Sequence, residues 1–383
     1  MKIDAIDLHH IQIPFAAPYK LSKKYGTLTD AHAVIVKIYT DHGVTGVGEA
    51  DPLNPFTEET PGTVMAIMRD AIAPLILGMD PTRINTIEGF LDRAVLGHPV
   101  ARGAVNMALF DILGKIRNAP VYDLLGGMAQ SRLPIMGAIG SGTPEEDAEA
   151  IGKWMDRGCD TVMIKMGVLP IRDEIRRLEA AQGRFGDRVR FIVDANQGWD
   201  VPQALAFMDG VRRFPPYLLE QPVDRVDLHG LARTRGRAVC PVSADESLVG
   251  LEDAARLIEH RAVDAFSLKV SKNGGLIATL KIAHAAEAFG LRCLMNSMLE
   301  FGVTQAASLQ LGCALTNLLD CGHAYMSVLR MADDITDFGR FIDGATVSVP
   351  MAPGLGVQLD EDKLNHYTVA SLRLPNGKEG NAP

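Results

Sequence analysis

The sequence contains Arg190-Phe-Ile-Val-Asp194, Tyr217-Leu-Leu-Glu220 and Val239-Cys-Pro-Val-Ser-Ala-Asp245, three short apolar runs that each end in an acidic residue. The acidic residues follow one another at intervals of 26 and 25 residues. One strand, one helix and their loops take up about that length in a parallel βα barrel. We therefore predict three consecutive barrel strands whose carboxyl ends bring the three carboxylates together at one rim.

Three carboxylates at one rim suit a hard divalent cation. Mg²⁺ prefers oxygen ligands and keeps positions open for a substrate, and Mn²⁺ accepts the same donors. Polar residues also occur at strand ends simply because the loops there are solvated. Three acidic residues in three consecutive units favour a metal site, which we predict at Asp194, Glu220 and Asp245, with Mg²⁺ as the ion and Mn²⁺ as its substitute.

From Leu133 onward, strand patterns alternate with helix patterns, which is typical of a parallel sheet. Eight such strands favour an α/β fold with a modified TIM barrel of the (β/α)7β type, whose last unit need not be regular. The expected strands are Leu133–Ala138, Thr161–Lys165, Arg190–Asp194, Tyr217–Glu220, Val239–Asp245, Ala265–Lys269, Arg292–Asn296 and Asn317–Cys321.

The chain of 383 residues exceeds the size at which a single core keeps growing, so more than one domain is expected. Strand alternation up to about residue 50, followed by helix patterns such as Ala101–Ile116, predicts an α+β capping domain over residues 1–128. The barrel is expected over residues 129–330. Residues 331–383, with a strand at Gly354–Leu359, are expected to return to the cap.

Composition excludes several classes of function. A net charge of −9 without a basic stripe argues against a nucleic acid or an anionic membrane as partner. No apolar stretch approaches the length of a membrane span, and acidic residues and histidines within the first ten positions argue against a signal peptide. A cytoplasmic protein with reduced thiols is expected, because no pair at metal-ligand spacing occurs among Cys159, Cys240, Cys293, Cys313 and Cys321.

Two lysines end predicted strands on opposite sides of the barrel. Lys165 ends the second strand and Lys269 the sixth, so their ammonium groups are expected to face each other across the mouth. A substrate carboxylate bound to the cation would hold its α-carbon between them. One lysine must be neutral to act as a base, and a nearby cation and a second ammonium both lower its pKa. A lone lysine at a strand end is more often solvated, but the pair beside three carboxylates favours proton transfer.

The lysines and carboxylates stand in longer motifs, which are Met163-Ile-Lys165-Met-Gly167, Asp194-Ala-Asn196, Glu220-Gln-Pro222, Ala244-Asp-Glu-Ser247, Lys269-Val-Ser-Lys-Asn-Gly-Gly275 and Leu124-Leu-Gly-Gly127. These motifs resemble the enolase superfamily, in its mandelate racemase/muconate-lactonizing-enzyme subgroup. The resemblance extends over nearly the whole chain. It implies Mg²⁺-dependent removal of the α-proton from a small carboxylate substrate by the opposed lysines, which is the mechanism known for the superfamily.

The resemblance also implies supporting residues and an assembly. Asn196 and Glu246 are expected to hold the ligands and the bases in place, with Glu246 paired to Lys269. Members of the family commonly assemble into symmetric oligomers, so a homo-oligomer is expected.

Loops of the cap around residues 20–26 and 51–60 are implied to close over the site. There Lys23, Lys24 and Tyr25 are candidates to meet a distant anionic group of the substrate. The alternative is that they are ordinary solvated residues of a surface loop.

Two positions depart from the family pattern. Met163 stands where the subgroup usually has the first lysine of a Lys-x-Lys pair, on the same strand face as residue 165, so a like charge that would lower the pKa of the base is missing. After the last strand, Asp320-Cys-Gly-His323 replaces the glutamate of cycloisomerases and the Asp-x-Asp of dipeptide epimerases. His323 and Glu300 are candidate substrate-binding residues, although a purely structural role in the loops suits each equally well.

Several reactions share the half-reaction that these residues predict. We favour racemisation, epimerisation or cycloisomerisation, with β-elimination from a hydroxylated carboxylate or hydroxy amino acid as the alternative. A barrel retained only for binding, without turnover, is the alternative from another class of function. A metal-dependent hydrolase is disfavoured because its ligands would include histidines.

Overall fold

The computed structural model describes residues 1–376 and contains a curled sheet of parallel strands in the order β11-β10-β9-β8-β7-β6-β5. The strand interiors are almost wholly buried, as expected where helices cover the outer face of a parallel sheet. The strands are β5 (Gly137–Ile139), β6 (Thr161–Lys165), β7 (Arg190–Asp194), β8 (Leu218–Glu220), β9 (Val242–Ala244), β10 (Ala265–Leu268) and β11 (Arg292–Met295).

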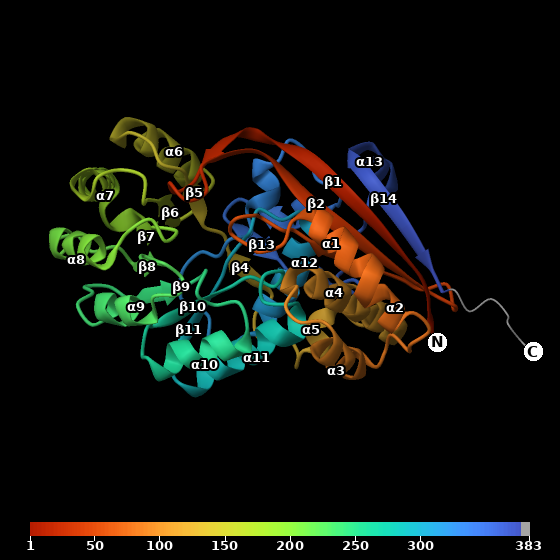
Figure 1. Cartoon of the computed structure of the whole chain (residues 1–383). Coiled ribbons are helices and arrows are strands. Elements are labelled where there is room, and N and C mark those ends of the chain that lie inside the picture. The colour runs from red at the N-terminus through yellow and green to blue at the C-terminus, as the bar shows by residue number, and fades with distance from the viewer. Residues whose placement is uncertain (377–383) are drawn as a thin grey trace, which may run out of the picture.

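Helices alternate with these strands and surround the outer side of the curled sheet (Figure 1). This arrangement confirms the predicted α/β fold with a modified barrel. The helices are α6 (Pro144–Asp156), α7 (Ile171–Phe185), α8 (Val201–Gly210), α9 (Leu228–Arg235), α10 (Leu251–Glu259), α11 (Leu276–Ala288) and α12 (Gly302–Ala314), with a 3₁₀ turn, η2, at Gly186–Arg188.

The first and last predicted strands of the barrel differ from the expectation. Leu133–Ala138 is divided, because β4 (Arg132–Pro134) pairs with β13 (Thr346–Ser348) in a separate small sheet. The third strand of that sheet, β12 (Ile342–Asp343), pairs with the other edge of β13. The segment predicted at Asn317–Cys321 is not a strand. It forms one parallel bridge to Cys293, and the chain just after it forms another to Ile135, so it closes the barrel between β11 and β5 with few backbone hydrogen bonds.

An antiparallel sheet in the order β14-β1-β2-β3 forms the cap. Its strands are β1 (Ile3–Lys20), β2 (Thr27–Thr40), β3 (Thr45–Ala50) and β14 (Thr368–Pro375). Because β14 pairs with β1 along most of its length, the prediction that the C-terminal segment returns to the cap is confirmed. Gly354–Leu359 contributes only isolated bridges, so the strand predicted there is wrong. The domain limits at residues 128 and 330 stay predictions.

Helix α4 packs tightly against β3 of the cap sheet. A Cβ atom at Gly46 would lie 2.1 Å from the carbonyl oxygen of Ala108, and one at Gly48 would lie 1.9 Å from that of Ala104, so only glycine permits this close approach. The remaining elements are α1 (Pro61–Ile67), η1 (Met68–Ile72), α2 (Ala73–Ile76), α3 (Ile84–Ala94), α4 (Pro99–Arg117), α5 (Val121–Leu124), η3 (Ser327–Arg330), η4 (Phe338–Phe341) and α13 (Glu361–Tyr367).

The β1–β2 hairpin extends from the cap to the side of the barrel near β5 and α6 (Figure 1). Its tip, residues 20–27, contacts the barrel where the serine hydroxyl of Ser22 donates a 3.2 Å hydrogen bond to the carbonyl oxygen of Asn196. The cap therefore forms one wall of the space above the carboxyl ends of the strands. None of the helices in the described part of the chain combines the length and the apolar character that a membrane crossing requires.

Candidate active site

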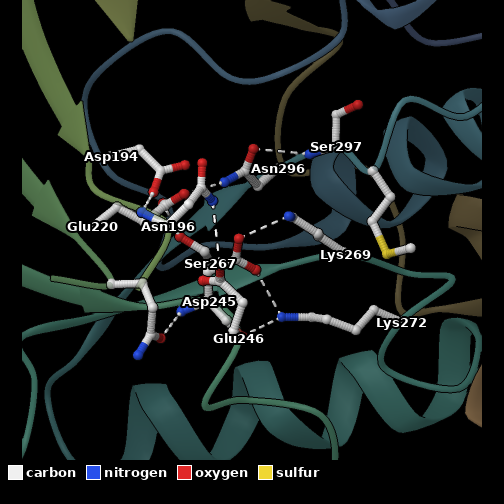
Figure 2. Close-up of polar contacts among 12 residues, drawn as sticks. Asp194, Asn196, Glu220, Asp245, Glu246, Ser267, Lys269, Lys272, Asn296 and Ser297 are labelled. Atoms are coloured by element: carbon white, nitrogen blue, oxygen red, sulfur yellow. Dashed lines mark hydrogen bonds and ion pairs between the residues drawn. The ribbon is translucent and has the colours of Figure 1, made fainter. Parts of the chain in front are cut away.

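The strand register brings the predicted carboxylates together. Lys165, Asp194 and Glu220 lie directly opposite one another across β6, β7 and β8, and Asp245 follows β9 by one residue. One carboxylate oxygen of each acidic residue lies within 4.8 Å of those of the other two, and the three side chains are fully buried. Figure 2 shows the cluster with the side chains that surround it.

The chemistry of these three side chains fits a divalent cation. Burial, reinforced by the charges of Asp194 and Asp245, raises the pKa of Glu220 well above its ordinary value. Three carboxylates so close together in a buried site repel one another unless positive charge compensates them. Their oxygen donors are those that hard divalent cations prefer, so this triad could hold such an ion.

The two opposed lysines supply part of the compensating charge. The Lys165 ammonium donates a hydrogen bond to Asp194, and the Lys269 ammonium donates to Asp245 Oδ2 at 2.7 Å. Burial lowers the pKa of each lysine, but the neighbouring carboxylates outweigh it and raise both pKa values above the ordinary range. The lowered pKa expected for the base therefore requires a cation that neutralises these carboxylates.

A third lysine at the site was not predicted from the sequence. The Lys272 ammonium donates to Asp245 Oδ1 at 2.8 Å and also to the main-chain carbonyl of Asp245. Figure 2 shows Lys269 and Lys272 directed at Asp245 together. Burial would raise the pKa of Asp245, but the two ammonium groups lower it to about 2. The signal that could have identified Lys272 in the sequence is its position three residues after Lys269, in the run Lys269-Val-Ser-Lys272.

Two further polar side chains hold Glu220 and were also missed. The Ser267 hydroxyl donates to Glu220 Oε2, and the Asn296 amide donates to Oε1 at 2.8 Å. Ser267 lies two residues before Lys269, and side chains two apart on a strand face the same side. That spacing was the signal that could have identified it.

The supporting residues only partly match the prediction. The backbone N–H of Asn196 donates to Asp194 Oδ1 at 2.9 Å, so this position does support a carboxylate of the triad. The predicted pair of Glu246 with Lys269 is wrong, because Glu246 Oε1 instead accepts hydrogen bonds from the Tyr25 hydroxyl at 3.0 Å and from the Asn196 amide at 3.3 Å. The chain leaves β9 at Ala244 and turns at Asp245–Ser247, so Asp245 faces the lysines and Glu246 faces the cap.

The hairpin tip of the cap is held down by Lys24 and Tyr25. The Lys24 ammonium donates to Gln197 Oε1 at 3.0 Å and to Asp224 Oδ2 at 2.9 Å, and Lys23 is exposed. Lys24 is paired with the barrel and Lys23 lies outside the pocket wall, so the predicted contact of these two lysines with a substrate anion stays a prediction. Tyr25 does line the pocket.

A pocket with about 530 Å³ of empty space, part of it open to solvent, lies above the triad. Lys165 and Lys269 both line it, and Met163 lines it beside Lys165, as predicted for two residues on one strand face. Phe56 packs over the Lys269 ammonium, which lies 4.2 Å from the ring centroid. The other lining residues come from the cap and from the loops after the strands: Tyr19, Leu21, Tyr25, Leu53, Ala138, Asn196, Asn296, Ser297, Met298, Leu299, Met326, Ser327 and Arg330.

Glu300 and His323 are buried outside the pocket wall, so their predicted role as substrate-binding residues stays a prediction. Glu300 is buried, and its Oε2 accepts hydrogen bonds from the Ser297 hydroxyl and the Met298 N–H at 2.9 and 2.6 Å. It therefore shapes the loop that lines the pocket but does not line the pocket itself. His323 is also buried, and its Nδ1 accepts the N–H of Met295.

We predict that His323 makes the protein less stable in mild acid. Burial lowers the pKa of His323 to about 4, whereas in the unfolded chain it is about 6.5. The neutral imidazole therefore contributes fully to the free energy of unfolding above pH 6.5. This contribution is lost as the pH falls towards 4, and the loss is about 3 kcal/mol at most. His323→Asn, whose amide oxygen replaces the Nδ1 acceptor, should lose less stability than the wild type between pH 7 and pH 4.5 in urea titrations.

The control for this measurement is His284→Asn, because His284 is exposed on α11. This variant should follow the wild-type acid profile. Equal losses in His323→Asn and the wild type would contradict the assignment.

The comparisons with known proteins agree with this geometry. Residues 5–126 match the family model of the mandelate racemase/muconate lactonizing enzyme N-terminal domain, and residues 146–363 match that of the enolase C-terminal domain-like family. The chain belongs to the enolase superfamily. Its matches place it in the muconate-lactonizing-enzyme subgroup, as the motifs predicted.

Three superfamily members that are similar to this chain along nearly their whole length are isomerases. An N-succinyl-L-Arg/Lys racemase from Bacillus cereus is 30% identical over 96% of this chain and 98% of that protein, and its crystal structure superposes with a TM-score of 0.94. A chloromuconate cycloisomerase from Pseudomonas putida is 33% identical over 97% of this chain and 100% of that protein. An L-Ala-D/L-Glu epimerase from Clostridium acetobutylicum is 32% identical over 94% of this chain and 99% of that protein.

Proposed function

We propose that this protein removes the α-proton of a small carboxylate substrate and returns a proton to the opposite face, so that it racemises or epimerises the α-carbon. One observation carries the proposal. Lys165 at the end of β6 and Lys269 after β10 line the same pocket, on either side of the three strand ends that carry the acidic triad. Two proton carriers facing each other suit removal and return of a proton on opposite faces of one carbon.

The proposed cofactor is Mg²⁺, held by Asp194, Glu220 and Asp245, with Mn²⁺ as an ion of similar donor preference. When bound, such a cation stabilises the negative charge that develops on the substrate carboxylate as the α-proton leaves. The neutral member of the lysine pair accepts the α-proton, and the protonated member donates from the other side. Lys272 stays beside Asp245 in this scheme and balances its charge when Lys269 turns to the substrate.

Cycloisomerisation is the second candidate, since the chloromuconate cycloisomerase is similar to this chain along its whole length. It needs one lysine for proton transfer and the other only for its charge. β-Elimination would begin with the same proton removal. A homo-oligomer and a cytoplasmic location also remain part of the proposal.

Deuterium incorporation at the α-carbon in D₂O tests the proposed half-reaction. The purified protein with MgCl₂ is incubated with N-acylated amino acids, N-alkylated amino acids, dipeptides and lactones, and the α-proton signal is followed by NMR. We expect at least one class to lose this signal in a reaction that EDTA stops and Mg²⁺ restores. Absence of exchange from all four classes, with Mg²⁺ and with Mn²⁺, would contradict the proposal and favour a non-catalytic binding protein.

A further inference from the structure

We propose that Arg177 is a positioning residue for the reaction, because its guanidinium lies at the centre of a buried ion network that holds the backbone of Lys165. The network consists of Asp147 on α6 and of Glu174 and Arg177 on α7, and all three lie outside the wall of the pocket above the triad. In Figure 1 both helices lie beside β5 and β6. This inference rests on the proposed function, because it assumes that the Lys165 ammonium transfers a proton.

The charges of the network are buried and closely paired. Arg177 is only 1% exposed. Its Nε donates to Asp147 Oδ2 at 2.8 Å and its Nη2 donates to Oδ1 at 3.1 Å, so the two groups meet in the planar fork that fits a guanidinium to a carboxylate. Its Nη1 donates to Glu174 Oε2 at 2.9 Å. Carboxylates on two helices therefore give the guanidinium a single orientation.

The other N–H donors of the guanidinium reach the ends of two barrel strands. Nη1 also donates to the carbonyl oxygen of Lys165 at 3.1 Å, and Nη2 also donates to that of Gly140 at 3.3 Å. Lys165 ends β6, and Gly140 directly follows β5. Together with the contacts to Asp147 and Glu174, these hydrogen bonds use every N–H donor of the guanidinium. Arg177 therefore joins two helices to the strand end that carries the proposed base.

The segment that follows Lys165 is held by the same network. Glu174 Oε1 accepts hydrogen bonds from the backbone N–H groups of Val168 and Leu169 at 3.1 and 2.9 Å. In addition, the Ser141 hydroxyl donates to the carbonyl oxygen of Lys165 at 3.1 Å. The carbonyl group of Lys165 and the turn after it are therefore fixed, and with them the point from which the lysine side chain extends into the pocket.

The opposed lysine is held by different groups. The backbone N–H of Lys269 donates to Asn273 Oδ1 at 2.8 Å, and the Asn273 amide donates to the carbonyl oxygens of Leu248 and Val249 at 3.0 Å each. The hydrogen bonds of Arg177 go instead to α6, α7 and the ends of β5 and β6. Loss of Arg177 should therefore displace Lys165 and leave Lys269 in place.

Stability alone does not account for a buried ion network of this kind. Replacing a buried ion pair by apolar side chains of similar volume is often neutral or stabilising, whereas removing one partner leaves a buried charge unpaired. The test variant is therefore Arg177→Met/Asp147→Leu, which removes the ion pair as a whole. In this variant Glu174 keeps the backbone N–H groups that donate to it, so the fold should be retained.

Hydrogen–deuterium exchange of the backbone amides, measured by mass spectrometry, tests the anchor without a substrate. Amides of residues 165–169 should exchange about 10-fold faster or more in the double variant, because this turn loses hydrogen bonds to a charged group. Amides of residues 268–274, around the opposed lysine, should keep the wild-type rate. Arg176→Met is the matched control, because Arg176 precedes Arg177 on α7 with its side chain 61% exposed, and it should behave as the wild type.

Exchange of the α-proton in D₂O with MgCl₂ tests the role in the reaction, with both pure enantiomers of the compound that exchanges fastest in the screen described above. The double variant should slow only the enantiomer that Lys165→Ala slows, by about 10- to 100-fold in kcat, which is the scale of a misplacement of roughly 1 Å. Its KM should stay the same, because the network lies outside the pocket wall. Arg177→Lys, which keeps the charge but lacks the planar fork, should retain part of the rate.

Slowing of one enantiomer alone, together with faster amide exchange at residues 165–169, would support both the anchor and the proposed function. Equal slowing of both enantiomers would overturn the anchor, since a general loss of stability affects both lysines. Unchanged rates for both enantiomers, or unchanged amide exchange at residues 165–169, would overturn it as well. If no compound exchanges its α-proton with the wild type but the double variant opens residues 165–169, the network still positions Lys165 and the proposed function fails for the classes screened.

Discussion

Lys165→Ala is expected to slow proton removal from one enantiomer of the substrate by at least about 100-fold, and Lys269→Ala from the other. The two lysines line opposite sides of one pocket, so each reaches only one face of the α-carbon. General acid–base catalysis by a positioned side chain contributes about 10²- to 10⁴-fold, and each variant should lose exchange of its own enantiomer by a factor in this range. Racemisation needs both lysines and should fall in both variants.

The measurement is the rate of α-proton loss in D₂O for each pure enantiomer with each variant. Lys153→Ala is a suitable control, because this lysine lies on α6 with its side chain 73% exposed. Its rates should equal those of the wild type. If Lys165→Ala slowed both enantiomers equally while Lys269→Ala slowed neither, the chemistry would use one base, which favours cycloisomerisation over racemisation.

Glu220→Gln should remove both the activity and the stabilisation by Mg²⁺. Glu220 is buried between Asp194 and Asp245, and burial together with their charges raises its pKa. Glutamine keeps the shape, an oxygen that accepts from the Asn296 amide and an NH₂ group that can donate to the Ser267 hydroxyl, but it removes one negative charge from the triad. Changes beside metal ligands typically cost 10- to 100-fold in affinity or activity, so loss of a ligand should reduce activity by more than about 100-fold.

Thermal unfolding distinguishes this loss from simple misfolding. Without metal, Glu220→Gln should unfold at a higher temperature than the wild type, because the buried repulsion is reduced. An ion at a concentration 100 times its dissociation constant stabilises the folded protein by about 2.7 kcal/mol. Only the wild type should gain this stabilisation from MgCl₂. The exposed Glu179 on α7 offers Glu179→Gln as a control. A variant that still gained stability from Mg²⁺ would place the ion elsewhere.

The central part of the site could be predicted because it depends on local sequence. Parallel strands joined by helices place their carboxyl ends at one edge, so the order of Lys165, Asp194, Glu220 and Asp245 along the chain becomes their order around the rim. The register of β6, β7 and β8 bears this out.

Other features depend on contacts between distant segments, which the sequence pattern does not contain. Glu246 looked like a partner for Lys269, but its direction is set by the hairpin tip more than 200 residues earlier, where Tyr25 donates to it. In the sequence, His323 cannot be distinguished from a loop histidine that contacts substrate. Only the tertiary packing shows that its side chain is buried. Arg330 and Ser327 lie in a 3₁₀ turn without apolar periodicity, so nothing in the sequence indicated that they line the pocket.

The stereochemical course of deuterium incorporation tests the central claim most directly. One pure, α-protiated enantiomer of a substrate that exchanges its α-proton is incubated in D₂O with the Mg²⁺-loaded protein, and both enantiomers are separated at early times and analysed by mass spectrometry. Opposed lysines predict that the newly formed enantiomer carries deuterium at the α-carbon, because the donating lysine has equilibrated with solvent. Two results would contradict the two-lysine account. One is a newly formed enantiomer that retains the original protium. The other is a complete absence of conversion together with loss of the α-proton from one face only.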